Sequence, residues 1–83
     1  MLKLPQTTYT VFADYGPRIG IGSADFSETL DDAADAVVEA MKHGATCCVE
    51  RNDRDPETGY GTVCDVTAQV AEVIRNRAIG RAA

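Results

Sequence analysis

The clearest periodicity in the chain lies between residues 28 and 43, where apolar and charged positions separate at helical spacing. The apolar positions recur three and four residues apart and are Leu30, Ala33, Ala34, Val37, Val38 and Met41. The acids collect on the opposite arc and are Glu28, Asp31, Asp32, Asp35 and Glu39. This pattern predicts an amphipathic helix over residues 28–43 with one face toward a core. Ser27 is placed to cap its first turn, and Gly44 to end it.

Two segments before this helix and two after it have the alternation and the residue types of β-strands. We predict strands at residues 8–15 and 18–26, joined by a turn that begins at Gly16. We predict two more at residues 45–51 and 60–66, joined by a polar loop at 52–59. Counting back from that loop along an antiparallel ladder places Cys47 opposite Cys64.

A second helix is predicted over residues 68–79, with Thr67 as its cap. Arg77 interrupts the apolar stripe of this helix, and its long stem is suited to cover apolar surface while the guanidinium reaches water. We expect the ends of the chain, residues 1–7 and 80–83, to be loosely held. The resulting order is strand, strand, helix, strand, strand, helix.

This order predicts a single α+β domain spanning residues 1–83, a four-stranded antiparallel ββαββα sheet with two helices packed on one face. A chain of 83 residues has room for only a small, two-layered core. We expect most of its five aromatic residues to lie in that core. Phe12 is out of phase with its neighbours in the first strand, so it covers the second sheet surface or marks an interaction patch.

The charge balance narrows the class of partner. The chain has 8 basic and 13 acidic side chains, for a net charge of -5. A protein with this balance is repelled by the phosphate backbone and by anionic membranes, and it favours a basic protein surface. We therefore expect no direct contact with nucleic acid or membrane. The sequence has neither the apolar run of a signal peptide nor that of a membrane span, which predicts a cytoplasmic location.

The residues that most often carry chemistry do not form a recognisable site. The cysteine count is odd and Cys47 and Cys48 are adjacent, so we expect free thiols and no zinc site. The acidic loop at 52–59 lacks the spacing of a calcium-binding loop. His43 is the only histidine and lies at the C-terminal end of the first predicted helix, where a positive charge interacts favourably with the helix dipole. We predict no enzyme activity, no metal and no cofactor.

The acidic arc of the first helix is the strongest functional lead. A row of carboxylates without an interleaved lysine could imitate a row of phosphates and steer a basic partner. We therefore predict a small acidic protein-interaction module, with partner-binding residues Glu28, Asp31, Asp32, Asp35, Glu39 and Phe12. Small acidic chains of this kind are common among phage and mobile-element proteins that inhibit host nucleic-acid-binding defence complexes, including anti-CRISPR proteins. That comparison rests on size and charge alone.

Two other hypotheses remain open. The first is a structural homodimer that pairs through the open face of the sheet or through an edge strand. The second is a small metal or thiol-redox protein that uses Cys47, Cys64 and the acidic loop. Oligomeric state discriminates the first hypothesis, and the metal content of the purified protein tests the metal form of the second.

Overall fold

A computed structural model describes residues 6–82 of the protein, and their side chains except those of residues 23–26 and 81–82. The elements in chain order are β1 (Thr7–Asp14), β2 (Ile21–Ser27), α1 (Leu30–Lys42), β3 (Thr46–Arg54), β4 (Gly61–Asp65) and α2 (Thr67–Ala82). This order confirms the predicted α+β arrangement. No helix among the described residues is both long enough and apolar enough to cross a membrane.

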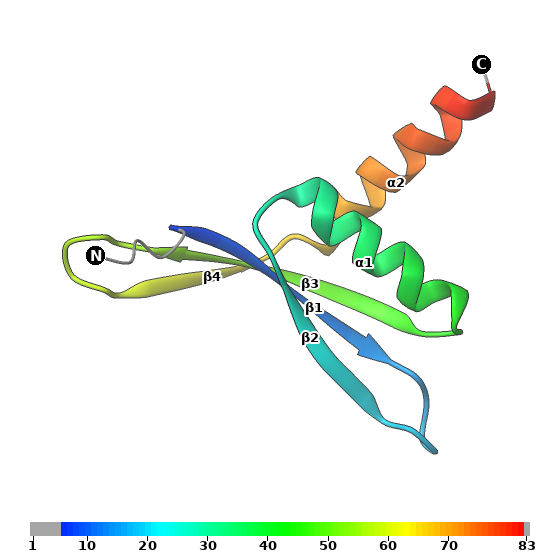
Figure 1. Cartoon of the computed structure of the whole chain (residues 1–83), viewed down its shortest axis with the longest axis horizontal. Helices are drawn as coiled ribbons and strands as arrows, with labels where there is room; N and C mark the ends of the chain where they lie inside the picture. The colour runs from blue at the N-terminus through cyan, green and yellow to red at the C-terminus, as the bar shows by residue number, and fades with distance from the viewer. Residues whose placement is uncertain (1–5, 83) are drawn as a thin grey trace.

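The four strands form one antiparallel sheet in the order β2-β1-β3-β4. Both helices lie on the same side of it, with α1 across the middle strands and α2 leaving the sheet toward its C-terminal end (Figure 1). Among the described elements none covers the other side. The sheet therefore has one packed face and one open face.

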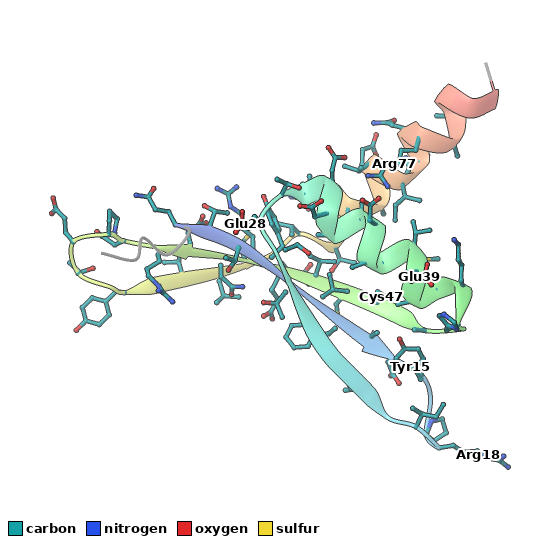
Figure 2. The ribbon with its side chains drawn as sticks, in the orientation of Figure 1. Tyr15, Arg18, Glu28, Glu39, Cys47 and Arg77 are labelled. Carbon is teal, nitrogen blue, oxygen red and sulfur yellow. The ribbon has the colours of Figure 1, made fainter. Side chains whose placement is uncertain are left out.

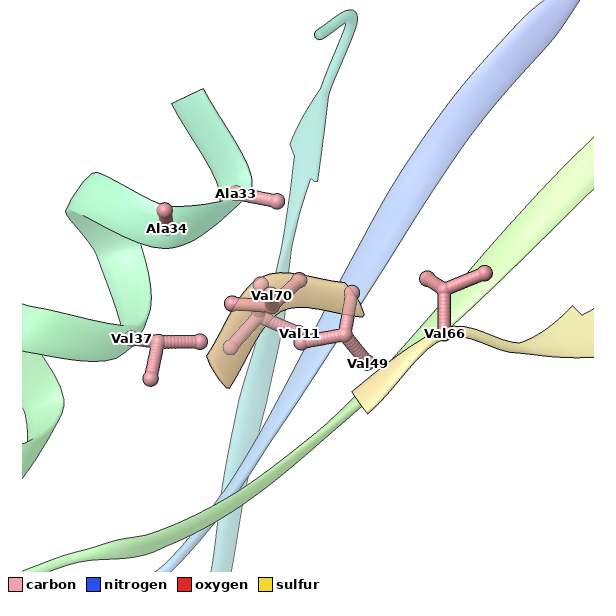
Figure 3. Packing of buried hydrophobic residues seen from close by; sticks show 7 residues of the cluster. All are labelled: Val11, Ala33, Ala34, Val37, Val49, Val66 and Val70. Atoms are coloured by element: carbon pink, nitrogen blue, oxygen red, sulfur yellow. The ribbon is translucent and has the colours of Figure 1, made fainter. Parts of the chain in front are cut away.

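The core is small and built from valine and alanine (Figure 3). Its members are Val11, Ala33, Ala34, Val37, Val49, Val66 and Val70. Val11 and Val49 face each other across β1 and β3, and the alanines of α1 let the helix approach the strands closely. Val49 and Val70 are the largest fully buried side chains of the described residues. A core of this size leaves little margin of stability.

None of the four aromatic residues whose side chains are described is a buried member of the core, so our expectation that most of the five lie in it is wrong. Tyr9 and Tyr15 are partly buried and pack against buried hydrophobic residues. Tyr9, Phe12 and Tyr15 are half-buried and Tyr60 is 81% exposed, while the side chain of Phe26 lies outside the described residues. Tyr15 packs on β2, where a Cβ added to Gly22 would lie 2.8 Å from its ring. Small side chains thus fill the core, and the described aromatic rings lie outside it.

Helix α1 begins two residues later than predicted. Strand β2 continues through Ser27, which pairs with Tyr9 and is buried. The cap is Thr29, whose hydroxyl accepts a hydrogen bond of 3.1 Å from the backbone amide of Asp32. The prediction that Ser27 caps the helix is therefore wrong. The predicted end is confirmed, because Gly44 follows the C-cap with a φ of +86° that favours glycine.

The turn between β1 and β2 is longer than predicted, so β2 begins at Ile21 and not at Arg18. The amide of Gly20 donates to the carbonyl oxygen of Gly16 at 2.7 Å, which closes a turn over residues 16–20. Ile19 lies in this turn and is 75% exposed. Ile19 therefore lies outside the strand that was predicted to include it.

The β3–β4 register also differs from the predicted one. Residues 52–54 extend β3, where Asn52 donates to the hydroxyl of Thr10 at 2.9 Å and Asp53 accepts from Thr7 at 2.8 Å. Cys64 consequently lies opposite Arg51, and the predicted pairing of Cys47 with Cys64 is wrong. The polar residues at 52–54 were predicted to form a loop. They belong to the strand instead, because the side chains of Asn52 and Asp53 hydrogen-bond to β1.

Helix α2 begins at Thr67, but this residue does not cap it as predicted. Its hydroxyl accepts a hydrogen bond from the amide of Val49 at 2.9 Å, which joins the helix start to β3. The carboxylate of Asp65 instead accepts from the amide of Thr67 at 2.8 Å. Among the described side chains of α2, Val70 is buried, and Val73 and Ile74 are partly buried and pack against the core.

Candidate functional site: the acidic face of helix α1

The side chains of α1 separate as its sequence predicts. Ala33, Ala34, Val37 and Ala40 are buried against the sheet. Met41, which was expected among them, is 56% exposed. The acids of the helix are on the outer side and exposed, and together with Glu28 they form what we call the acidic face: Glu28, Asp31, Asp32, Asp35 and Glu39.

Glu28 belongs to this face without belonging to the helix. It lies in the bend between β2 and the Thr29 cap. Figure 2 shows it before the first turn of α1, while Glu39 lies near the other end of the helix. Within α1, Asp31, Asp35 and Glu39 follow one another at intervals of four residues, or about 6 Å along the axis. The acidic face therefore runs the length of the helix.

Arg77 of α2 reaches this face and interrupts it (Figure 2). Its Nη1 donates to Asp35 Oδ1 at 2.7 Å, and its Nη2 donates to Asp31 Oδ1 at 3.2 Å and to the Asp31 carbonyl oxygen at 3.2 Å. The side chain of Arg77 is 32% exposed, while those of Asp31 and Asp35 are 78% and 67% exposed. The hydrogen bond to Asp35 is the main reason that the pKa of Arg77 is raised.

These contacts correct the expectation of a face without positive charge. The sequence shows no base within the first turns of α1, but the fold supplies one from a residue forty-two positions away. Two carboxylates share one guanidinium, so the cluster of Asp31, Asp35 and Arg77 keeps a net negative charge. The case for docking through Asp31 and Asp35 is weakened, since both already have a partner.

The remaining acids are less engaged. Glu39 lies 3.8 Å from Lys42 Nζ and 3.4 Å from His43 Nε2, in pairs that are about two-thirds exposed and that contribute little to stability. Glu28 and Asp32 have no ion-pair partner among the described side chains. The acidic face has five carboxylates, and two permanent cations, Arg77 and Lys42, lie beside it. The face therefore remains negative.

A shallow open cleft of about 400 Å³ lies where this face meets α2. Its lining residues are Asp35, Val38, Glu39, Lys42, Ile74, Arg77 and Ala78. It combines two carboxylates and two cations with a short apolar floor. Its two carboxylates are each paired with one of its two cations, so the cleft itself has no net charge.

Phe12 is not part of this site. Val11 and Ala13 point toward α1 and are buried, so Phe12 between them points to the open face of the sheet, where Cys48 lies opposite it. The structure thus separates Phe12 from the five acids with which it was grouped. A partner that lies on α1 does not contact it unless that partner wraps around the sheet edge.

The cysteines are all free thiols. Cys47 packs beside the core and lies opposite Ala13, and burial raises its pKa, with a smaller contribution from Cys48. Cys48 and Cys64 are exposed. Within the part of the chain that the structure describes, no three His, Cys, Asp or Glu side chains come together as a metal site would require.

Sequence reasoning missed the role of Arg77. The available signal was its place on the apolar stripe of α2, where a charged head must find water or a counter-ion at the edge of the packed face. Comparison of the chain with protein-family models, with curated proteins and with solved structures finds no match.

Proposed function

We propose that the protein is a small acidic protein-interaction module that docks onto a basic protein surface through the acidic face of α1. The observation that carries this proposal is the excess of carboxylates over cations on that face, with Glu28 and Asp32 exposed and without ion-pair partners among the described side chains. An excess of one sign raises the rate of encounter with a surface of the opposite sign.

The partner class that we propose is a protein whose lysines and arginines bind nucleic acid. The acids Asp31, Asp35 and Glu39 of α1 lie about one helical turn apart. Arg77 interrupts this row at Asp31 and Asp35, but the net charge of the row stays negative, which suits a surface that binds a phosphate backbone. An inhibitor of a host nucleic-acid-binding defence complex, comparable with anti-CRISPR proteins in size and charge, is the specific form of this proposal. The module would act by occupying the nucleic-acid-binding surface of that complex, without catalysis.

The five acids differ in how readily they can bind a partner. Glu28 and Asp32 can bind a partner's cation directly, since neither has to break an ion pair. Glu39 has only exposed pairs to exchange. Asp31 and Asp35 would contribute by exchanging Arg77 for a partner's cation, or by holding Arg77 as part of the surface.

Affinity capture from the native host tests this proposal when the bait is varied. Glu28→Lys with Asp32→Lys reverses two unpaired charges of the face, and Glu57→Lys with Glu72→Lys makes the same change in net charge elsewhere. We expect one protein to be retained by the wild type and by the control, lost with the first variant, and eluted by salt. We also expect DNA to compete with the module for that protein. Equal retention by all three baits would refute docking through the acidic face.

A further inference from the structure

Strand β4 is paired on one side only. It is the last strand in the order β2-β1-β3-β4, so within residues 6–82 nothing pairs with its outer edge. All five of its residues are exposed, and none is among the buried hydrophobic residues. Its pairing with β3 therefore rests on backbone hydrogen bonds, and its outer backbone groups are available to another strand.

The two edges of the sheet differ in how they are protected. At the β2 edge the register shifts between Val11 and Ala13, where β2 carries one extra residue, and such a bulge discourages pairing with another chain. At the β4 edge, Gly61 to Asp65 pair with β3 without a shift. The strand contains neither proline nor lysine, the residues that commonly block an edge. Only the β4 edge is thus regular and unblocked.

We propose that β4 pairs with β4 of a second copy of this chain, antiparallel and about a two-fold axis at Val63. In this register Val63 faces Val63 of the second copy, Thr62 faces Cys64, and Gly61 faces Asp65, so all five residues overlap. Two apolar side chains, each 63% exposed, meet at the centre. No like charges lie opposite each other, because each Asp65 faces a glycine.

The extended shape of the chain agrees with a surface that a second copy covers. Its accessible area is 6255 Å², whereas a compact monomer of this mass exposes about 4800 Å². Its radius of gyration is 14.3 Å, against about 12 Å for a compact chain of this length. The pairing joins the two sheets into one of eight strands with all helices on one side.

Light scattering of the wild type and two variants tests this pairing. Val63→Lys places two ammonium groups opposite each other at the axis, whereas Val63→Thr keeps a β-branched, uncharged side chain. We expect a wild-type dimer, a similar dimer for Val63→Thr, and dimer affinity at least about fivefold lower for Val63→Lys with an unchanged circular dichroism spectrum. A monomeric wild type, or a Val63→Lys dimer as tight as the wild type, would overturn the proposal.

Cross-linking tests the register separately. In a Cys48→Ser background, Thr62→Cys places a thiol opposite Cys64 of the second copy, within reach of a disulfide. We expect oxidised glutathione to convert this variant to a covalent dimer, taking up the two electrons and two protons of each thiol pair. The same protein with Cys64→Ser should stay non-covalent. Equal cross-linking with and without Cys64 would contradict the register.

This inference does not depend on the proposed docking surface. Val63 and Thr62 are on β4, and none of the residues of the acidic face is changed in these variants. Loss of the dimer with intact partner capture would separate the two functions. Loss of capture in Glu28→Lys with Asp32→Lys should leave the dimer unchanged.

Discussion

Arg77 Nη1 donates a hydrogen bond to Asp35 Oδ1 at 2.7 Å, and this contact joins α2 to the outer side of α1. The same guanidinium reaches Asp31, so one cation serves two carboxylates. It lies in the middle of the surface that we propose for docking. Its removal should therefore make that surface more negative.

Arg77→Ala should bind an immobilised poly-L-arginine peptide more tightly than the wild type, by about two- to tenfold at low salt, because the acidic face loses its central cation. Arg77→Lys keeps the charge and serves as the control. Surface plasmon resonance at several salt concentrations measures the effect. Weaker binding by Arg77→Ala would contradict this prediction, and it would show that Arg77 matters more by holding Asp31 and Asp35 in place than by reducing the negative charge.

The cap of α1 can be tested directly. Thr29→Ala removes the acceptor of the Asp32 amide and should lower the free energy of unfolding by about 1 kcal/mol, as measured by urea denaturation. Thr29→Ser keeps the hydroxyl and should lie close to the wild type. A Thr29→Ala protein as stable as the wild type would place the helix start elsewhere.

Much of the fold follows from the sequence, because each element has a pattern of its own. The spacing from Leu30 to Met41 defines the first helix, and the alternation of Val11 and Ala13 defines the inner face of the first strand. The β3–β4 register does not follow, because residues 52–54 have polar side chains on both faces and neither face is set by burial. The role of Arg77 also requires the fold, since its partners are forty-two or more residues away.

The small core should make the fold sensitive to single deletions. Val49→Ala removes two methyl groups from a side chain that is fully buried and should cost about 2 kcal/mol of unfolding free energy. Ile79→Ala removes a larger group from a side chain that is 61% exposed, and its effect should stay within about 0.5 kcal/mol. Equal effects in urea denaturation would argue against the packing around Val49.

Asp65 should make stability fall in acid. The hydrogen bonds from Thr67, first from its amide, lower the pKa of this carboxyl below its ordinary 3.8. A group whose pKa is depressed by folding stabilises the protein above the unfolded-state value, and it loses that contribution as pH falls through the folded value. Asp65→Asn should therefore flatten the dependence of unfolding free energy on pH below 3.8. An unchanged slope would exclude this hydrogen bond as its source.

The three thiols should react at different rates with an aromatic disulfide reagent. Cys48 and Cys64 are exposed, whereas Cys47 is half-buried and burial raises its pKa, which lowers its thiolate fraction near neutral pH. Two thiols per chain should react rapidly and one slowly. Cys48→Ser should remove one rapid equivalent. A slow phase that disappears with Cys48→Ser would contradict the placement of Cys47.

Binding of the matched charge-reversal variants to the poly-L-arginine peptide tests the central claim most directly. Glu28→Lys with Asp32→Lys and Glu57→Lys with Glu72→Lys carry the same net charge and differ in where the charge lies. The second variant also removes the exposed ion pair of Glu72 with Arg75. If the acidic face docks basic surfaces, the first pair should bind about tenfold more weakly than the second at low salt, and the difference should shrink as salt is raised. Equal affinities for the two variants would show that net charge alone governs binding and would contradict a docking surface on α1.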